Sequence, residues 1–581
     1  MKSSNDLHAS LRAIDHKGYP AYKSLAGSYQ FESFILCIDH VQGDPFASPS
    51  SLHIEVLHKY AKFPEEYYVN QNYRIALQDH LIRLFAAKFE SYQFKAKGSG
   101  KSGLMSITRC GQEVLERSAC QITDDRIIVR FHVGFPAFGR TISAGELEKI
   151  LFDFLPDCIE HTFFYQNINQ QKVEQALFLY DDQEALRQIL KQEKLAAFVA
   201  DEAVLPRKSG VSDLPMKNSV PFSSPTSMRR TYILPHKGVI TGMAIPVGIT
   251  LIVGGGYHGK STLLEALQTG VYNHIAGDGR EYVITDHTAV KLRAEDGRGI
   301  RNVDISMFIK DLPNKKDTTV FSTPDASGST SQAAGVIESL EAGSRLFLID
   351  EDTSATNFML RDDFMQEVIN REKEPITPFL ERARDLYEKA GVSTILVAGS
   401  SGAFFYIADQ ILQMDNYLPV DITEKVKALC LKHKAPRTQA PGFQVPDFHR
   451  TLPPFRREAS TTSRRGGRGS SRSAGNALDT RHEHMKAKVF GKDSFSLDKE
   501  TVDLRYVEQL ADSEQTCALA YLLRYALEQP DENRTVQETV QLLTDLLTNK
   551  GWVPFCNSYV PCGLAKPRVQ EIYACLNRFR G

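Results

Sequence analysis

A glycine-rich loop that joins a predicted strand to a predicted helix is the feature that most constrains this chain. Residues 249–253 form a short apolar, β-prone run, and residues 261–267 carry the apolar pattern of a helix. Glycines let a backbone curl so that its N–H groups surround a phosphate, and the following helix N-terminus adds positive potential. The loop fits the pattern G-x-x-x-x-G-K-[ST] with Gly254, Gly255, Gly256, Tyr257, His258, Gly259, Lys260 and Ser261. The sequence therefore predicts an α/β domain that binds a nucleotide.

Three side chains at the end of this loop have predicted roles. We expect the amine of Lys260 to reach the β- and γ-phosphates of ATP, and the hydroxyl of Ser261 to bind Mg²⁺. Thr262, the next residue, belongs to the same predicted nucleotide-binding set. The alternative is a glycine-rich turn that fits the pattern by chance. The strand and helix on either side favour the nucleotide site.

A second predicted strand ends in acidic residues. Residues 345–349 lead into Asp350, Glu351 and Asp352. Buried parallel strands are continuous apolar runs, and functional residues lie at their carboxyl ends. We expect Asp350 to hold Mg²⁺ and Glu351 to orient and deprotonate the attacking water, with Asp352 as the alternative base. The competing interpretation is a core strand that merely happens to end in acids.

A second turn of small residues lies between these two motifs. Ser327, Gly328 and Ser329 precede an apolar helical run over 333–342. Such a turn points N–H groups at an anion, although taken alone it is simply a helix cap. Ser327 lies 23 residues before Asp350 (350 − 327). The turn by itself predicts only a helix cap.

Composition and length narrow the class of protein. The chain has 581 residues, of which 42% are hydrophobic and 24% charged, and these values exclude a wholly disordered chain or a coiled-coil rod. It contains no run of eighteen apolar residues, so no membrane-spanning helix is predicted. The nine cysteines include no C-x-x-C pair, which favours a reducing compartment over a disulfide framework or a Cys-rich zinc site.

Pattern changes along the chain predict five segments. These are an N-terminal α+β domain over 1–200, a linker over 201–238, an α/β core over 239–429, a flexible basic segment over 430–495, and a helical domain over 496–581.

Local patterns predict individual elements within these segments. In the first segment, residues 34–38 and 127–131 are expected to be strands, and residues 75–89, 147–155 and 170–200 are expected to be helical. Two sequence boxes, Ser143-x-x-Glu146 and Thr535-x-x-Glu538, are predicted to cap helices, and Gly551 is predicted to end the second of these helices.

The predicted flexible segment is rich in arginine and glycine. Over 451–490 it holds nine Lys/Arg against three Asp/Glu, although the whole chain has a net charge of −2. Cations of this kind bind phosphates with little sequence preference, so RNA or single-stranded DNA is the expected partner. A solvated loop is the alternative. The candidate nucleic-acid residues are Arg464, Arg465, Arg468 and Arg472, and a second candidate strip comprises Lys95, Lys97, Lys101, Arg109, Arg130 and Arg140.

The chain resembles the family of predicted ATPases of the ABC class. Its protist members resemble a subunit associated with the kinetoplastid mitochondrial RNA-binding complex. The segments that carry the resemblance are 38–47, 253–265, 294–298, 304–306, 326–332 and 350–357. The resemblance implies an α/β fold: an ABC-type P-loop ATPase core with an N-terminal α+β domain and a C-terminal helical domain.

This resemblance also assigns roles. It gives Ser327 and Gly328 the signature turn, which in ABC proteins closes over the nucleotide of another subunit. One loop and one signature per chain then imply a homodimer with two sandwiched nucleotides. The chain departs from the family pattern because no histidine follows the strand over 394–398, where Ser400 or Ser401 is the substitute, and because 304–308 replaces the glutamine loop without a glutamine.

Two functional hypotheses follow. The first is an ATP-binding, slowly hydrolysing ABC-class homodimer that uses Mg²⁺ and binds RNA or other nucleic acid, in an RNA-processing complex of the mitochondrial matrix and without a membrane partner. The second is a nucleotide-gated scaffold with little hydrolysis and no nucleic-acid partner. By resemblance the compartment is mitochondrial, and the cytoplasm is the alternative.

Overall fold

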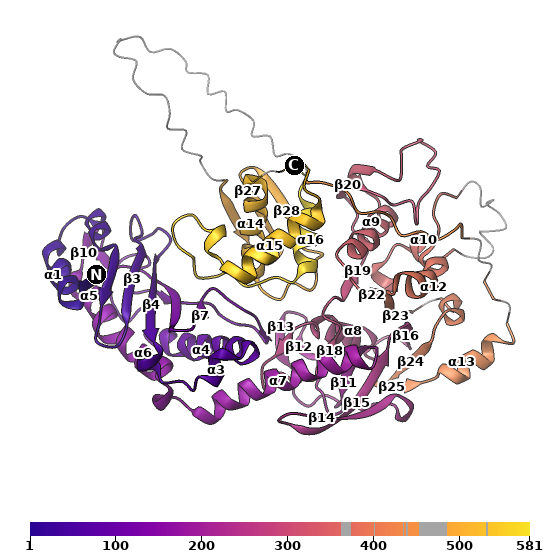
Figure 1. The fold of residues 1–581 in the computed structure, drawn as a ribbon, viewed down its shortest axis with the longest axis horizontal. Coiled ribbons are helices and arrows are strands. Elements are labelled where there is room, and N and C mark those ends of the chain that lie inside the picture. The colour runs from indigo at the N-terminus through magenta and orange to yellow at the C-terminus, as the bar shows by residue number, and fades with distance from the viewer. Residues whose placement is uncertain are drawn as a thin grey trace, which may run out of the picture.

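The computed structural model describes residues 1–361, 374–399, 401–433, 435–436, 440–452, 485–529, 531 and 533–580. The N-terminal region and the central region lie side by side, and the C-terminal region sits above the junction between them (Figure 1). A long helix, α7 (Gln170–Gln192), runs along the opposite side and joins the first two regions.

The N-terminal region is built on one mixed sheet. Its central strands pair antiparallel in the order β2-β3-β4-β8, and the apolar residues that alternate along them face a core covered by α4 (Gln71–Glu90) and α6 (Leu155–Phe163). The predicted strands and the predicted helix over 75–89 are confirmed. The strands are β1 (Lys2–Ser3), β2 (Gly27–Gln30), β3 (Ile35–His40), β4 (Ser50–Leu57), β5 (Met105–Ser106), β7 (Cys120–Ile122) and β8 (Arg126–Val133).

The helix predicted over 147–155 differs from the structure. The chain forms α5 (Ala144–Glu148), then a π-helical turn over Lys149–Phe154, then α6. Ser143 makes no side-chain cap bond, so the predicted capping box is wrong. The reason is that the Glu146 carboxylate is used elsewhere: it accepts from the Lys97 backbone N–H at 2.8 Å and pairs with Lys149.

The helix predicted over 170–200 is correct only to Gln192. Lys194 has a positive φ of 55°, and the apolar run behind it forms the buried strand β11 (Leu195–Ala200). A short apolar run does not distinguish a buried strand from a helix by periodicity, which explains the error. Helix α7 packs Leu177 into the N-terminal core and Leu190 into the next one.

β11 belongs to a four-stranded antiparallel sheet beside the central domain. The order is β14-β15-β11-β18, so residues before position 200 pair with residues beyond 238. The segment predicted as a linker thus carries strands of its own; the five segment boundaries remain predictions. The strands are β12 (Arg207–Ser209), β13 (Ser212–Pro215), β14 (Arg229–Leu234), β15 (Gly238–Pro246) and β18 (Val283–Thr285).

The central sheet has six strands in the order β19-β22-β23-β16-β24-β25. All pair parallel except β25, which forms a hairpin with β24. Helices α8 (Lys260–Thr269) and α12 (Phe379–Ala390) contact its strands. The strands are β16 (Ile249–Val253), β19 (Val290–Leu292), β22 (Leu346–Asp350), β23 (Ser393–Val397), β24 (Gln410–Asp415) and β25 (Leu418–Asp421). This parallel arrangement is the predicted α/β core.

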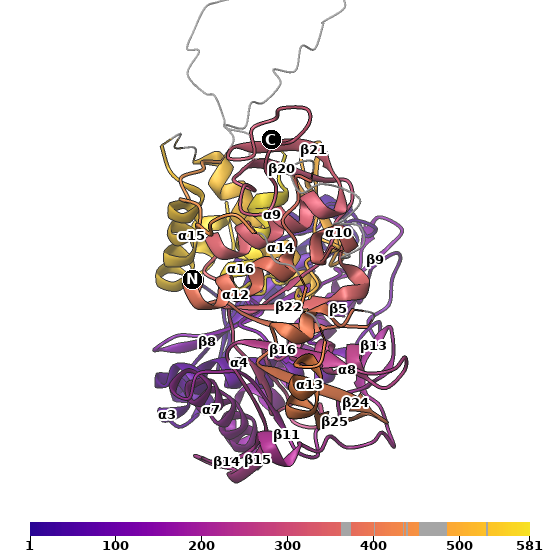
Figure 2. The ribbon, with the colours of Figure 1, turned by 90° about the vertical axis from the view of Figure 1, so that its right-hand side faces the viewer.

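Helix α9 (Gly328–Glu341) stands beyond β19 with a hairpin of β20 (Arg298–Val303) and β21 (Phe321–Ala326). It contacts α10 (Thr356–Met359) on one side and α16 (Val569–Arg578) of the C-terminal region on another (Figure 2). The C-terminal region therefore supports α9.

The C-terminal region contains helices and a small sheet. The predicted box at Thr535 and Glu538 caps α15 (Val536–Lys550), and Gly551 ends it, as predicted. A three-stranded antiparallel sheet, which the sequence reasoning missed, precedes the helices. Its strands are β26 (Ala487–Phe490), β27 (Ser494–Leu497) and β28 (Glu500–Asp503), followed by α14 (Ser513–Glu528), α15 and α16.

A buried arginine links the two terminal regions. Arg117 is almost fully buried and pairs with Glu514 at 2.6 Å and with Asp512 at 2.8 Å. In the part of the chain that the structure describes, no helix has the length and apolar character needed to cross a membrane.

Candidate nucleotide site

The loop and the acidic strand meet at one edge of the central sheet. β23 lies between β16 and β22, and all three strands run parallel, so their carboxyl ends lie together. In the register, Ile252 is opposite Val397, which in turn is opposite Asp350. With strands about 4.8 Å apart, the acidic end lies roughly 10 Å from the end of β16. That separation leaves space for phosphates and a metal ion between them.

The backbone of the loop requires glycine at two positions. Gly254 has a φ of 140°, and a Cβ there would lie 2.5 Å from the Met414 carbonyl oxygen. Gly259 has a φ of 95° directly before α8, where a Cβ would lie 3.2 Å from the Tyr417 ring. Both conformations are costly for other residues, so these glycines fix the curl of the loop.

Lys260 folds back over the loop that precedes it. Its Nζ donates to the carbonyl oxygens of Gly254 at 2.7 Å and Gly255 at 2.8 Å. Gly255, Gly256 and Tyr257 are exposed at the tip of the loop, and Ser261 is exposed on the first turn of α8. The loop thus presents backbone, an amine and a hydroxyl on one accessible surface at a helix N-terminus.

The hairpin turn between β24 and β25 holds the loop from the side. His258 Nδ1 accepts from the Asn416 N–H at 2.9 Å, and the Tyr417 N–H donates to the His258 carbonyl oxygen at 3.2 Å. Asn416 and Tyr417 have φ values of 47° and 71°. Two residues in this conformation form a tight hairpin turn, but a bulky residue such as tyrosine adopts it at a cost. His258 belongs to the predicted loop, but the hairpin turn that holds it is not evident from the sequence.

A cavity of about 350 Å³ opens beside the loop, toward the segment that precedes β14. Tyr417 is 55% exposed and lies on its wall. The walls also include Leu205, Pro206, Met216, Asn218, Ser219, Val220, Phe222, Gly259, Thr262 and Met414. Most of these residues are apolar, and the cavity adjoins the glycine-rich loop.

The acidic residues at the end of β22 differ in their surroundings. Asp350 is only 8% exposed, and burial raises the pKa of its carboxyl group above the ordinary value, against the Asp352 N–H bond that lowers it. Its Oδ1 accepts from that N–H at 3.2 Å. Glu351 Oε2 accepts from the Gly399 N–H at 2.7 Å, just beyond β23. The structure thus brings Glu351 to the edge where β16 ends.

The turn of small residues begins α9 as predicted. Ser327 is the N-cap residue and its hydroxyl accepts from the Thr330 N–H at 3.5 Å. Gly328 is packed closely, because a Cβ there would lie 3.2 Å from both the Ala294 Cβ and the Asp296 carboxylate. Ser327 is exposed and Ser329 is partly buried, so the turn presents its hydroxyls at the surface.

Gln332 joins this turn to the acidic loop. Its Nε2 donates to the Ser354 hydroxyl at 2.9 Å, and its Oε1 accepts from the Ala355 N–H at 2.9 Å. Gln332 lies in one of the segments that carry the family resemblance, yet the sequence analysis gave it no role. These two hydrogen bonds connect the start of α9 to the loop after β22.

Buried ion pairs lie beside α9, and one of them involves the C-terminal region. Arg298 pairs with Glu338 of α9, and Arg578 of α16 pairs with Glu295 at 2.5 Å. The same region contacts the other half of the domain, since Gln509 Nε2 donates to the carbonyl oxygens of Gln268 and Ala289. One region therefore touches both α8 and the helix behind the small-residue turn.

Several predicted residues receive a different assignment or none. Arg464, Arg465, Arg468 and Arg472 lie outside the described residues, as does Ser400. Ser401 Oγ accepts from the Ala403 N–H at 3.2 Å, so it shapes a turn. Asp304 likewise caps a turn by accepting from the Ser306 N–H.

The second candidate basic strip loses Arg130, while its other five residues are exposed or partly exposed. Arg130 is buried and donates to the Ser118 carbonyl oxygen at 2.8 Å, and Arg109 pairs with Glu90. Arg130 was misplaced because its position on β8 turns the side chain into the protein, which a count of cations in the sequence does not reveal.

Three family models match the chain. Residues 4–166 match the model described as ATPase of the ABC class N-terminal, and residues 169–450 match the P-loop domain of ABC_ATPase. Residues 486–581 match the MRB1590 C-terminal domain. The central region is therefore an ABC-type P-loop nucleotide-binding domain. The chain as a whole belongs to the ATPases of the ABC class, and it carries a C-terminal domain of the MRB1590 type.

One curated relative and two solved structures are similar to parts of the chain. This chain is 29% identical to the uncharacterized protein MJ1628 of Methanocaldococcus jannaschii over 235 residues. The aligned part covers 38% of this chain and 50% of that protein. The chain thus spans about half the length of this curated relative.

The two solved structures are of proteins from ABC transporters. One is the ADP conformation of MJ1267, an ATP-binding cassette of an ABC transporter, with 12% identity, a TM-score of 0.24, and coverage of 40% of this chain and 93% of that one. The other is cbiO1 from Clostridium perfringens, part of the ABC transporter complex cbiONQ, with 13% identity and a TM-score of 0.24. The match covers 41% of this chain and 92% of that one.

Proposed function

We propose that this ABC-class protein binds and slowly hydrolyses ATP with Mg²⁺ at the edge where β16, β23 and β22 end. The single observation that carries the proposal is the glycine-rich loop with Lys260 folded over it, directly in front of α8. Lys260 and the loop amides bind the β- and γ-phosphates, as an amine and aligned N–H groups do in other phosphate loops.

Ser261 and Asp350 hold the magnesium ion in this proposal. One is a hydroxyl at the start of α8 and the other a carboxylate across two strand spacings, and both are hard oxygen ligands of the kind Mg²⁺ prefers. Glu351, which the Gly399 N–H orients, positions the water that attacks the γ-phosphate.

The base of the nucleotide occupies the cavity beside the loop. Gly259 of the loop and Thr262 on the first turn of α8 both line the cavity, so a nucleotide whose phosphates lie on the loop reaches this cavity with its base. The Tyr417 side chain then stacks on the base or packs at its edge. Inorganic tripolyphosphate tests this part, because it should bind the loop and leave the cavity unused.

The small-residue turn belongs to a second nucleotide site. Ser327 and Ser329 present hydroxyls at the start of α9, whose contacts are with α10, α16 and its own hairpin. The proposal is that this turn covers the nucleotide of a second copy, so that ATP joins two chains.

RNA or another single-stranded nucleic acid is the proposed partner. The support is the arginine- and glycine-rich composition over 451–490, together with an MRB1590-type C-terminal domain directly behind it. By family resemblance the setting is an RNA-processing complex of the mitochondrial matrix, with the cytoplasm as the alternative. Filter binding of an oligonucleotide should weaken steeply with salt. An oligonucleotide affinity that does not change with salt concentration, and does not change when residues 456–472 are deleted, would contradict the RNA proposal.

A nucleotide-gated scaffold is the second candidate. The loop after β23 favours this candidate, because its described residues include Ser401 and no histidine. The Ser401 hydroxyl already accepts a hydrogen bond from the Ala403 N–H. A serine adds no positive charge to a γ-phosphate. Phosphate release equal to that of Glu351→Gln would favour the scaffold.

Light scattering of wild type and Glu351→Gln with and without Mg-ATP tests the central proposal. Glu351→Gln keeps the size and shape of the side chain but cannot accept a proton, so it should bind ATP and remain dimeric for longer. A monomer in every condition contradicts the dimer, and the absence of nucleotide binding contradicts the site itself.

A further inference from the structure

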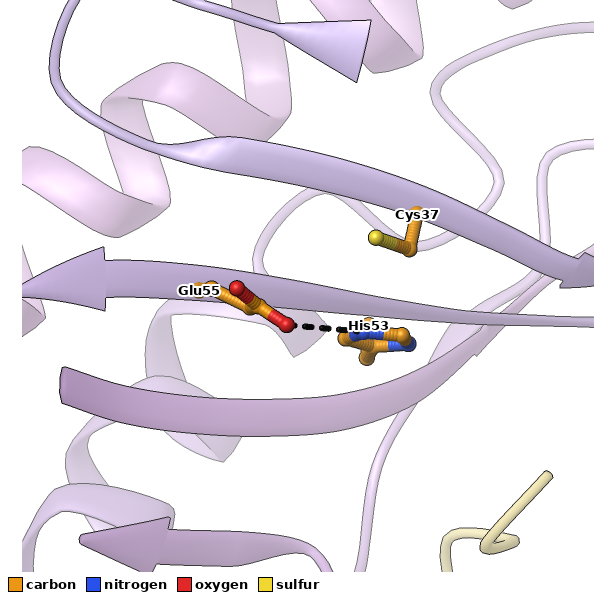
Figure 3. Close-up of side chains that lie close together, drawn as sticks. All are labelled: Cys37, His53 and Glu55. Carbon is orange, nitrogen blue, oxygen red and sulfur yellow. Dashed lines mark ion pairs between the residues drawn. The ribbon is translucent and has the colours of Figure 1, made fainter. Parts of the chain in front are cut away.

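The outer face of the N-terminal sheet carries a cluster that the nucleotide site does not use. Cys37 on β3 and His53 on β4 are directly opposite each other in the antiparallel register, and Glu55 follows His53 on the same face. Figure 3 shows the three side chains gathered on adjacent strands. Register alone brings together a thiol, an imidazole and a carboxylate that are unlike the apolar residues of the opposite face.

The donor atoms of this cluster are close enough to share an ion. One donor atom from each residue lies within 4.8 Å of the others, and His53 Nε2 is 3.6 Å from Glu55 Oε1. Tetrahedral zinc with bonds of about 2.0 Å to nitrogen and about 2.3 Å to sulfur separates its ligands by roughly 3.3–3.7 Å. The observed spacing needs only small side-chain rotations to reach that geometry.

Neighbouring side chains orient two of the three candidate ligands. His53 Nδ1 bonds to Asp39 Oδ2 at 2.7 Å, which leaves Nε2 as the coordinating nitrogen. Arg126 forms an ion pair with the Oε2 atom of Glu55, and the Oε1 atom of Glu55 faces His53. A carboxylate on the far nitrogen of a histidine is the usual support of a metal-bound imidazole. Asp39 lies in the segment 38–47, which carried the family resemblance but received no function.

The third ligand is almost enclosed. The Cys37 side chain is 7% exposed, and its thiol lies 3.2 Å from the Ser28 hydroxyl on the next strand. A thiolate formed there can accept a hydrogen bond from Ser28, so the sulfur keeps a partner after it loses its proton. The pair of a soft sulfur and an imidazole, with one carboxylate, matches the ligands of zinc better than those of magnesium or calcium.

We propose that Cys37, His53 and Glu55 bind one Zn²⁺ ion on the N-terminal sheet, with water as the fourth ligand. On binding, the thiol proton and any proton on His53 Nε2 pass to solvent, while zinc forms bonds to sulfur, nitrogen and the Glu55 oxygen. Asp39 acts as a positioning residue. The proposal is independent of the nucleotide site, which lies in another region of the chain.

The alternative is a metal-free ion-pair cluster around a protonated histidine. Asp39, Glu55, Arg126 and His53 satisfy one another in that case, and no ion is required. The two interpretations differ in one measurable respect, which is whether the Cys37 sulfur ever bonds to a metal.

Cobalt(II) titration of the full chain, without nucleotide or magnesium, distinguishes them. We expect one equivalent to bind with a thiolate-to-cobalt charge-transfer band, and Zn²⁺ to displace it. Cys37→Ser should remove the band, whereas Cys430→Ser, which changes a free cysteine of the central region, should leave it unchanged. Asp39→Asn should weaken binding by about 10- to 100-fold and keep the band.

Two results overturn the proposal. One is a wild-type chain that binds no stoichiometric Co²⁺ or Zn²⁺, and the other is a charge-transfer band that persists in Cys37→Ser. Circular dichroism of each variant verifies that it is folded. If Cys37→Ser does not fold, the cobalt affinities of Asp39→Asn and His53→Ala test the proposal instead, because both variants retain the Cys37 thiol. Wild-type affinity in both variants would contradict the zinc site.

Discussion

The two turns that precede α8 and α9 are similar in sequence character but are held in different ways. The loop before α8 is shaped from inside, by glycines with positive φ and by Lys260 bonded to its own carbonyls. The start of α9 is held by contacts with other elements: Gln332 bonds to the loop after β22, Glu338 pairs with Arg298 of β20, and Arg578 of α16 pairs with nearby Glu295. A small-residue turn before a helix can thus be shaped by its own backbone or by contacts with neighbouring elements.

This difference separates the effects that mutations should have. A change in the first turn should alter nucleotide affinity and leave the rest of the fold intact. A change around the second turn should alter stability and pairing of chains, while one chain alone still binds nucleotide.

The largest expected effect is on stability, at the ion pair behind α9. Arg298→Met leaves Glu338 buried without its partner, which should lower the free energy of unfolding by about 3–5 kcal/mol. Replacing both residues, as in Arg298→Met with Glu338→Leu, should recover most of that loss. Urea unfolding measures it. Arg345→Met, which breaks the exposed pair with Asp286, should cost about 1 kcal/mol or less. Equal losses in the two single variants would contradict the dependence of α9 on buried charge.

The next effect is on nucleotide binding at the first turn. Lys260→Ala removes a charged donor from the phosphates and should weaken ATP by about 10- to 100-fold, because such bonds contribute about 1.5–3 kcal/mol. Fluorescence titration with labelled ATP measures the change. Lys425→Ala, on the exposed face of α13 (Thr423–Cys430), is the control. Full affinity in Lys260→Ala would remove the nucleotide site.

A third effect concerns crowding at the second turn. Gly328→Ala places a Cβ 3.2 Å from two neighbours, so stability should fall by about 1–3 kcal/mol and ATP-dependent pairing should weaken. ATP binding by one chain should not change. Gly335→Ala, later in the same helix, meets its nearest neighbour at 3.7 Å and should be neutral or stabilising. Thermal unfolding measures the change in stability, and light scattering measures ATP-dependent pairing. Equal losses in Gly328→Ala and Gly335→Ala would contradict the packing argument.

The smallest effect is on the base of the nucleotide. Tyr417→Ala should weaken ATP by roughly fivefold to tenfold, since aromatic contacts contribute about 0.5–1.5 kcal/mol, whereas tripolyphosphate should bind equally well. Tyr417→Phe should retain the wild-type ratio. If ATP and tripolyphosphate lose affinity together, the hairpin turn supports the loop and does not contact the base.

The sequence predicts the parts of the site that are local. The strand, loop and helix around Lys260 are contiguous, and so are the apolar run and the acids that end at Glu351. Their meeting at one edge follows from parallel pairing, which the alternation of strands and helices suggested.

Long-range features are absent from any local pattern. Tyr417 reaches the loop because the hairpin of β24 and β25 lies next to β16, and sheet order is not encoded in a window of residues. β11 was mistaken for helix because its apolar run matches both periods. Cys37 and His53 are brought together by register between strands, and alternation alone does not specify which residues become opposite.

Helix α7 spans two hydrophobic cores without a break, and this has a mechanical consequence. Its 23 residues form a rod of about 34 Å, with Leu177 of the first half in the N-terminal core and Leu190 near the C-terminal end in the next core. Over that length, a tilt of about 10° at one end of the helix moves the other end by roughly 6 Å. Because the helix has no break, a tilt of the four-stranded sheet would carry the far end of α7 with it.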